Sequence, residues 1–174
     1  MKWNEHTDKL CPIAQTLGVI GEYWSLLILR NSFMGVKRFD EFQEQLGMTR
    51  HVLAGRLKTL VEHGVLKKVP YGENAGRFEY RLTEKGLDLY PVMMTMASWG
   101  NKWLFEEGQE PIVHIHNTCD KPTKPIINCS ECGDPLYTKE VTIASGKPLV
   151  ELAKTKDNES LTKELGFRPP IRSV

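Results

Sequence analysis

The feature of this 174-residue chain that most constrains its fold is a pair of short helical patterns joined by a glycine-containing turn. Apolar residues recur at helical spacing in both patterns: Phe39, Phe42 and Leu46 in the first, and Leu53, Leu57, Leu60 and Val61 in the second. Gly47 suits a left-handed stop after the first pattern, and Thr49 is a good N-cap for the second, which runs to about His63. Two helices joined by so short a turn predict a helix-turn-helix.

The residues that follow Gly64 predict a β-hairpin. Residues 65–69 and 77–82 have the composition of strands, and the second run alternates strictly between polar and apolar side chains. Residues 70–76 between them form a glycine-containing loop. A hairpin attached directly to a helix-turn-helix is a wing. The expected fold class is therefore α+β: a mainly α-helical winged helix-turn-helix with a two-stranded wing, dimerising terminal helices and a small β-rich extension toward the C-terminus.

The second helix and the wing supply the candidate DNA contacts. The residues expected to face DNA are Thr49, Arg50, His51, Gly55, Arg56, Lys58 and Thr59 of the helix, and Arg77 at the tip of the wing. Between residues 49 and 68, five basic residues accompany a single acidic one, a net charge of +4 in a chain whose total is +1. Arginine can bind guanine or phosphate, and a glycine permits close approach to the groove. A solvated basic face is the alternative, but the wing and the concentrated charge favour DNA binding.

Five motifs, taken in their order along the chain, carry a resemblance to a known family. They are Cys11–Ala14 (CPIA), Gly21–Arg30 (GEYWSLLILR), Arg38–Phe42 (RFDEF), Leu53–Leu60 (LAGRLKTL) and Tyr80–Gly86 (YRLTEKG). Over roughly residues 10 to 105, this order resembles HxlR-type transcriptional regulators, which are winged-helix proteins related to the MarR group. The resemblance implies a homodimeric bacterial or archaeal regulator that binds a double-stranded DNA operator. It also implies that residues 49–63 form the recognition helix. The segment after Gly146 is longer than this family leads us to expect.

The sequence offers little support for an enzyme. It contains no P-loop and no GxGxxG, HExxH or GxSxG motif, so we expect no catalytic residues. The alternative function is that of a winged-helix protein-interaction module without sequence-specific DNA binding. Such a module would not need the basic residues Arg50, Arg56 and Lys58, which this chain retains.

A long apolar segment after the wing predicts a dimer interface. Thr83 can cap a helix that continues toward residue 105, and Pro91 either kinks that helix or marks its true start. Its apolar residues point to nearly every side: Val92, Met93, Met94, Met96, Ala97, Trp99, Trp103, Leu104 and Phe105. A second protomer is the expected cover, which predicts a homodimer on a palindromic operator. The alternative is that these side chains fill the core of the monomer.

Cys11 is the candidate sensor of a small-molecule or redox effector. It precedes Pro12, which favours the first turn of a helix, so its thiol is expected beside a helix N-terminus, where a thiolate is stabilised. The resemblance implies a sensor role too, because relatives use this N-terminal cysteine to respond to oxidants and electrophiles. The alternative is an inert, buried small residue.

A second cysteine cluster suggests a zinc site. Cys129 and Cys132 form a CxxC knuckle, and Cys119 with His116 or His114 could complete four ligands. A second CxxC pair is missing, so the alternative is an unmetallated extension with reduced thiols and no cofactor.

Composition divides the chain into three regions. Residues 1–109 hold the DNA-binding and dimerisation domain, residues 110–145 the β-rich extension, and residues 146–174 a sparse tail, partly helical or loosely docked. Within the extension, residues 112–116 and 140–143 have strand composition. A mean hydropathy of −0.37, no long apolar run and no signal-like start lead us to expect a cytoplasmic protein that does not enter membranes.

Overall fold

The computed structural model of the chain describes residues 10–72, 76–166 and 168–170. Its contacts group the chain into two compact units. One unit is Tyr23–Ile127, and the other joins the described parts of Met1–Glu22 and Asn128–Val174. The centre of the predicted wing loop, residues 73–75, lies outside the described residues, as do the first nine and the last four residues of the chain.

Three helices of the larger unit form the predicted helix-turn-helix and its support. They are α2 (Tyr23–Phe33), α3 (Phe39–Leu46) and α4 (Arg50–Glu62). α3 ends at Gly47, whose φ of 64° is the left-handed conformation that glycine adopts without strain. α4 begins at Thr49, whose Oγ1 accepts a hydrogen bond of 3.4 Å from the amide of Val52. Both boundaries therefore lie where the sequence predicts them.

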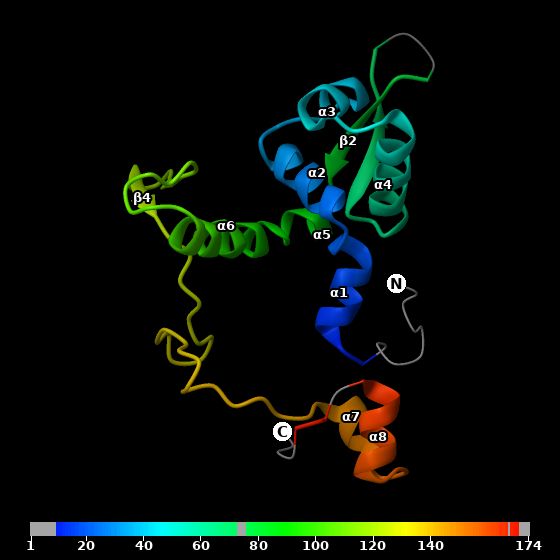
Figure 1. Cartoon of the computed structure of the whole chain (residues 1–174), viewed down its shortest axis with the longest axis vertical. Helices are drawn as coiled ribbons and strands as arrows, with labels where there is room; N and C mark the ends of the chain where they lie inside the picture. The colour runs from blue at the N-terminus through cyan, green and yellow to red at the C-terminus, as the bar shows by residue number, and fades with distance from the viewer. Residues whose placement is uncertain (1–9, 73–75, 167, 171–174) are drawn as a thin grey trace. The chain divides into compact units, whose positions relative to one another are not determined.

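The wing is an antiparallel hairpin of β1 (Leu66–Pro70) and β2 (Phe78–Leu82). Leu66 pairs with Leu82 at its base and Pro70 with Phe78 toward its tip. β1 packs on α4 and β2 on α3, which places the hairpin beside both helices of the helix-turn-helix (Figure 1).

Fully buried apolar side chains hold these elements together. They come from each of the three helices and from the start of the wing: Ile28, Leu29, Phe42, Leu53, Leu57, Leu60, Val65 and Leu66. Seven residues of the two helical patterns were predicted to face the core. Four of them are fully buried, and the other three, Phe39, Leu46 and Val61, are half-buried. Burial of this apolar surface is the main stabilising contribution to the unit.

Two separate helices follow the wing, where the sequence left open a single helix kinked at Pro91. α5 (Glu84–Leu87) is capped by Thr83, whose Oγ1 accepts from the amide of Gly86 at 3.1 Å. α6 (Tyr90–Leu104) is a separate 15-residue helix with a proline in its first turn, so Pro91 marks a start and not a kink. α6 contains no buried residue in the monomer.

The extension begins as part of the larger unit. The strands β3 (His114–His116) and β4 (Lys121–Thr123) form a two-stranded hairpin. The Nδ2 of Asn101 on α6 donates to the carbonyl of Ile112 at 2.7 Å, which ties the hairpin to the helix. The predicted strand at residues 140–143 is wrong. These residues have no strand partner, and an isolated strand is not stable without one.

The smaller unit contains α1 (Pro12–Ile20), α7 (Lys147–Ala153) and α8 (Asn158–Leu165). Leu161 and Leu165 of α8 are buried, and the hydroxyl of Ser145 donates to the carbonyl of Pro170 at 2.8 Å. Residues 147–165 thus contain two helices, as the partly helical alternative for the tail expects, and the contacts divide the chain after residues 22 and 127.

Among the described residues, no single helix is long and apolar enough to cross a membrane. Only α1 and α2 counted together, across a break, meet that length and composition.

Candidate nucleic-acid interface

α4 presents one face to the core and the other to solvent. Leu53, Leu57 and Leu60 are fully buried, whereas His51, Gly55 and Lys58 are exposed. Thr49, which caps the helix, is exposed as well, and Arg56 and Thr59 are half-buried on the flanks. The structure therefore gathers the predicted contact residues of the helix on and beside a single surface.

Gly55 leaves an opening in the middle of that surface. A Cβ atom built at this position meets no described atom within 4 Å apart from its chain neighbours and the nearby backbone of α4. The hydroxyl of Thr59, one turn later, donates to the carbonyl of Gly55 at 3.1 Å, so this hydroxyl is bonded within the helix. A glycine on the exposed side of a helix allows the backbone to approach a ligand closely at that point.

Arg50 is held at the start of α4 by residues of α3. Its Nη1 lies 3.1 Å from Oδ1 of Asp40 and 3.0 Å from Oε1 of Gln43, and its guanidinium carbon lies 4.8 Å from the centre of the Phe39 ring. Sequence reasoning placed Arg50 among the DNA contacts and did not identify these partners. The structure shows it bridging the two helices while it remains exposed.

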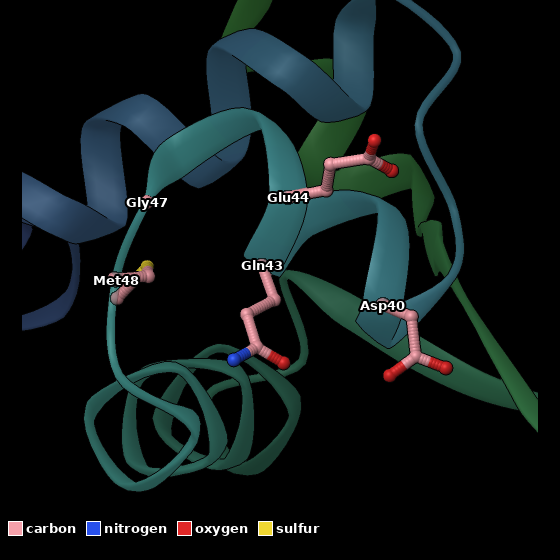
Figure 2. A pocket seen from close by; sticks show the side chains of 5 residues that line it. All are labelled: Asp40, Gln43, Glu44, Gly47 and Met48. Carbon is pink, nitrogen blue, oxygen red and sulfur yellow. The ribbon is translucent and has the colours of Figure 1, made fainter.

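A shallow hollow of about 340 Å³ adjoins this bridge, lined by Asp40, Gln43, Glu44, Gly47 and Met48. Figure 2 shows that its polar side chains come from one side of α3 and that Gly47 and Met48 belong to the turn. Asp40 and Glu44 make the lining acidic, which disfavours a phosphate there. The hollow therefore does not extend the basic surface of α4.

The other basic residues lie on α4 and the wing. Lys58 forms an exposed ion pair of 3.6 Å with Glu62 one turn later. Lys68 of β1 lies 5.6 Å from the ring centre of Phe78 and 5.7 Å from that of Tyr80. Arg77 is exposed immediately before β2, where its carbonyl accepts from the amide of Tyr71 at 3.1 Å. The wing thus adds exposed positive charge to that of α4.

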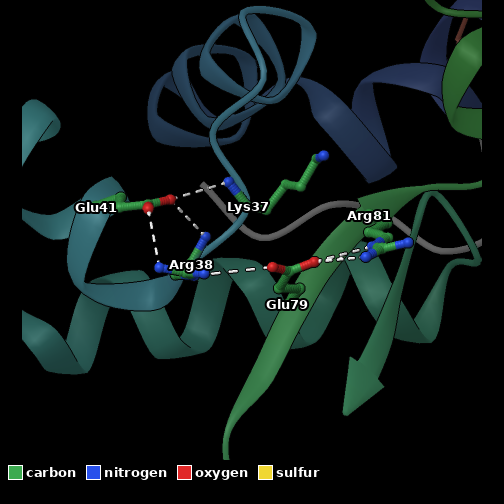
Figure 3. Close-up of polar contacts among 5 residues, drawn as sticks. All are labelled: Lys37, Arg38, Glu41, Glu79 and Arg81. Atoms are coloured by element: carbon green, nitrogen blue, oxygen red, sulfur yellow. Dashed lines mark hydrogen bonds and ion pairs between the residues drawn. The ribbon is translucent and has the colours of Figure 1, made fainter. Parts of the chain in front are cut away.

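A polar cluster fastens the wing to α3, and sequence reasoning missed it. Glu79 of β2 accepts from Arg81 at 2.8 Å and pairs with Arg38 at 3.7 Å, while Glu41 accepts from the amides of Lys37 and Arg38 (Figure 3). The hydrogen bond from Arg81 holds the pKa of Glu79 below its usual value of 4.5, and the charge of Arg38 acts in the same direction. The amide of Tyr80 also donates to the carbonyl of Lys37 at 2.7 Å.

Cys11 occupies the N-cap of α1, as predicted. Its Sγ accepts from the amide of Ala14 at 3.5 Å, and the residue is half-buried and has a free thiol. The thiol therefore lies at the N-terminal end of a helix, in the position that the CP motif indicates.

The predicted zinc ligands occur as two pairs. Sγ of Cys119 lies 3.4 Å from Nδ1 of His116, and Cys129 and Cys132 share a tight turn. Hydrogen bonds from the amides of Cys132 and Glu131 hold the pKa of the Cys129 thiol below its usual value. His114 instead packs edge-on against Tyr90, with ring centres 6.4 Å apart. In the described parts of the chain, no three His, Cys, Asp or Glu side chains lie close enough together to hold a metal ion.

A comparison with known families identifies the kind of helix-turn-helix that this chain contains. A family model described as HxlR-like helix-turn-helix matches residues 19–108, more than half of the chain. The chain belongs to the HxlR-like helix-turn-helix family. In this HxlR-like protein the matched region contains α2 to α6, and the two pairs of predicted zinc ligands lie beyond its end.

Relatives and solved structures agree with the family. The uncharacterized HTH-type transcriptional regulator Rv3095 of Mycobacterium tuberculosis is 39% identical over 134 residues, which are 77% of this chain and 85% of the relative. The structure of PA1607, described as a candidate transcription factor, is 36% identical with a TM-score of 0.71, covering 80% of this chain and 98% of its own. PA1374 of Pseudomonas aeruginosa, described in the same way, is 31% identical with a TM-score of 0.57, covering 88% and 99%. This HxlR-like chain is accordingly a winged-helix transcription regulator and not an enzyme.

Proposed function

We propose that this regulator binds a specific double-stranded DNA operator as a homodimer. The observation that carries the proposal is the exposed surface of α4, where the open position at Gly55 is flanked by Arg56 and Lys58 and bordered by the basic wing. A helix with a glycine and basic residues on its solvent-facing side fits the major groove. The glycine allows the helix to approach the bases, and the basic side chains attract the phosphates.

Each part of this surface has a separate role in the proposal. Arg56 and Lys58 contact phosphates or guanine from α4, and Arg77 follows the adjacent backbone from the wing. Arg50, through its bonds to Asp40 and Gln43, holds the start of α4 against α3 and presents its remaining guanidinium nitrogens to phosphate. Asp40 thereby keeps Arg50 in place without neutralising the rest of the surface.

The dimer is proposed from α6. Its exposed apolar residues Val92, Met96, Trp99 and Trp103 follow one another at intervals of four, three and four, which is a continuous stripe along one side of a helix. A second copy of α6 covers such a stripe best, because a twofold axis matches the stripe to itself. Two recognition helices related by that axis read half-sites about 34–36 Å apart, which requires a palindromic operator. A regulator of chromosomal DNA works in the cytoplasm.

A titration of the reduced protein tests DNA binding. We expect strong preference for a duplex from upstream of its own or a neighbouring gene over a scrambled duplex at the same salt concentration. Arg56→Ala should weaken operator binding about tenfold or more without unfolding the protein. Arg168→Ala, an exposed arginine of the smaller unit, is the matched control and should leave affinity unchanged. Equal binding to both duplexes, with no effect of Arg56→Ala, would favour the protein-interaction module instead.

We further propose that Cys11 makes DNA binding responsive to oxidants or electrophiles. Its free thiol at the N-cap of α1 is half-buried and so remains partly accessible to a thiol-reactive compound. Treating the protein with a thiol-reactive electrophile should lower operator affinity in the native chain and not in Cys11→Ser, whose hydroxyl preserves the N-cap. An equal loss of affinity in both proteins would exclude Cys11 as the sensor.

A further inference from the structure

Arg38 extends the sheet of the wing by one residue. It forms an isolated antiparallel bridge with Glu79 of β2, and the amide of Tyr80 donates to the carbonyl of Lys37 at 2.7 Å. On its other side, Glu79 pairs with Val69 of β1. The order across the sheet is therefore Arg38, β2, β1, and α3 begins directly after Arg38, which is its N-cap.

The side chain of Arg38 reaches across β2 to the end of β1. Its guanidinium carbon lies 4.7 Å from the ring centre of Tyr71, the residue directly after β1, and its Nε lies 3.7 Å from Oε1 of Glu79. Residues that pair across neighbouring strands place their side chains on the same face of a sheet. Arg38, Glu79 and Val69 therefore share one face of the wing, and Arg38 connects the start of α3 to the end of β1 over that face.

Three neighbours hold the guanidinium of Arg38 in this place. Its Nη1 lies 3.9 Å from Oε1 of Glu41, and Figure 3 shows Arg38 between Glu41 and Glu79. Both ion pairs are long and 52% of the Arg38 side chain is exposed, so the pairs alone contribute little. The ring of Tyr71 adds a cation–π contact from a third element of the fold. Contacts with α3, β2 and the end of β1 together restrict the guanidinium.

Tyr71 is bonded directly to Arg77, the candidate DNA contact of the wing. The amide of Tyr71 donates to the carbonyl of Arg77 at 3.1 Å, one hydrogen bond beyond the paired residues of β1 and β2. Gly72 and Gly76 have φ values of 70° and 103°, so the loop that follows this bond contains two residues with wide conformational freedom. The direction in which Arg77 leaves the hairpin therefore depends on what holds Tyr71.

We propose that Arg38 is a positioning residue for DNA binding by the wing: by holding Tyr71, it sets the direction of Arg77. This inference rests on the proposed binding of an operator and deepens it, because it assigns a role to a residue outside the predicted contact surface. Arg38 acts on DNA through Tyr71 and Arg77. Arg77 therefore contributes its full share of the operator affinity only while Arg38 is present.

A double-mutant cycle on operator affinity tests the positioning role. Arg38→Ala and Arg77→Ala should each lower the affinity severalfold, but the double variant should bind about as tightly as Arg77→Ala alone, because both changes remove the same contact. Losses that multiply in the double variant would overturn the proposal, since Arg38 would then act independently of Arg77. Arg38→Lys keeps the charge but lacks the guanidinium that spans Tyr71 and two carboxylates, so it should bind as weakly as Arg38→Ala. Native affinity in Arg38→Lys would overturn the proposal as well.

Amide hydrogen exchange of the full-length protein without DNA tests the contact with Tyr71 separately. The amide of Tyr71 should exchange faster in Arg38→Ala than in the native protein, because its bond to Arg77 opens more often. Arg81→Ala removes an equal charge that is bonded to the same Glu79, and this matched control should leave the exchange at Tyr71 unchanged. Unchanged exchange in Arg38→Ala would overturn the proposal.

The two experiments separate this proposal from the proposed function. A native protein with no preference for its operator would overturn the proposed function and, with it, the role of Arg38 in DNA binding. Faster exchange at Tyr71 in Arg38→Ala would in that case still show that Arg38 holds the wing. Operator preference in the native protein combined with multiplying losses in the cycle would overturn the positioning role alone.

Discussion

At the scale of single residues, Gly55 is a glycine that lowers the stability of its helix and that the packing of the protein does not explain. It lies in the interior of α4, where glycine is a poor helix former, and no contact among the described residues requires its small size. Gly86, by contrast, is required by the fold, since a Cβ there would collide with the carbonyl oxygen of Val65. A glycine at this position fits the close approach of α4 to DNA proposed above.

We expect Gly55→Ala to stabilise the protein and to weaken its binding to DNA. Alanine in the interior of an exposed helix should raise the free energy of unfolding by up to about 1 kcal/mol. The added methyl group should lower operator affinity, because it fills the space where the helix approaches the groove. Thermal unfolding and a fluorescence-anisotropy titration measure the two effects.

Gly18→Ala is the matched control for this change. Gly18 is an exposed glycine within α1 that likewise has nothing within 4 Å of a built Cβ. The Gly18→Ala substitution should leave operator affinity unchanged. If Gly55→Ala also binds the operator as tightly as the native protein, α4 does not approach DNA closely at this position.

At the scale of elements, the wing depends on a charged connection to α3. Glu79 links Arg81 on its own strand to Arg38 at the N-cap of α3, and the amide of Tyr80 bonds to the chain just before that cap. Figure 3 shows Glu79 lying between the two arginines. The orientation of the wing relative to the helix-turn-helix therefore rests on this carboxylate as well as on the apolar core.

We expect Glu79→Gln to lower stability at neutral pH and to lose that effect in acid. The pKa of Glu79 is lower in the folded protein than the ordinary value of 4.5, so the ionised carboxylate favours the folded state. This contribution is present above pH 4.5 and disappears as the pH falls through the lowered pKa. Urea unfolding at neutral pH and below pH 4.5 should show the difference between native and variant shrinking on acidification.

Glu62→Gln serves as the comparison for this variant. Glu62 pairs with Lys58 at 3.6 Å, but 60% of its side chain is exposed, and exposed pairs contribute little. Its substitution should change stability less than that of Glu79 at neutral pH. An equal effect of both variants would mean that Glu79 acts as an ordinary surface charge.

At the scale of the whole molecule, α6 is a helix whose apolar side chains are not buried within one chain. A 15-residue helix with two tryptophans, three methionines and no buried residue is unusual for a monomer. Trp99 and Trp103 expose 60% and 63% of their surfaces. Such exposure is costly in water and is removed when a second copy packs against it.

We expect Trp103→Glu to convert a dimer into a monomer. A charge buried between two apolar helices is poorly solvated, and its twofold mate repels it. Size-exclusion chromatography with light scattering should give twice the chain mass of 19.9 kDa for the native protein and the single mass for the variant. Operator affinity should fall with it, because each protomer alone reads one half-site.

Met34→Glu controls for the general effect of a surface charge. Met34 lies outside α6 and is as exposed as Trp103, at 63%. The Met34→Glu variant should remain dimeric. A native protein that runs at the mass of one chain would contradict the assignment of α6 as the interface.

The sequence by itself determined the helix-turn-helix and the wing almost to the residue. The stop at Gly47, the cap at Thr49 and the cap at Cys11 all lie where predicted, because capping depends on one side chain and the next few amides. The inward leucines of α4 follow from helical period alone. These features are local, so the order of residues is enough to determine them.

Only the tertiary structure decided which distant groups meet. The bridge from Arg50 to Asp40, the position of Glu79 between two arginines, and the grouping of α1 with the C-terminal helices join residues far apart in the chain. The strand expected at residues 140–143 failed for the same reason. Its β-branched residues satisfy a local preference, but a strand exists only where another strand offers hydrogen bonds, and composition does not say where that partner will be.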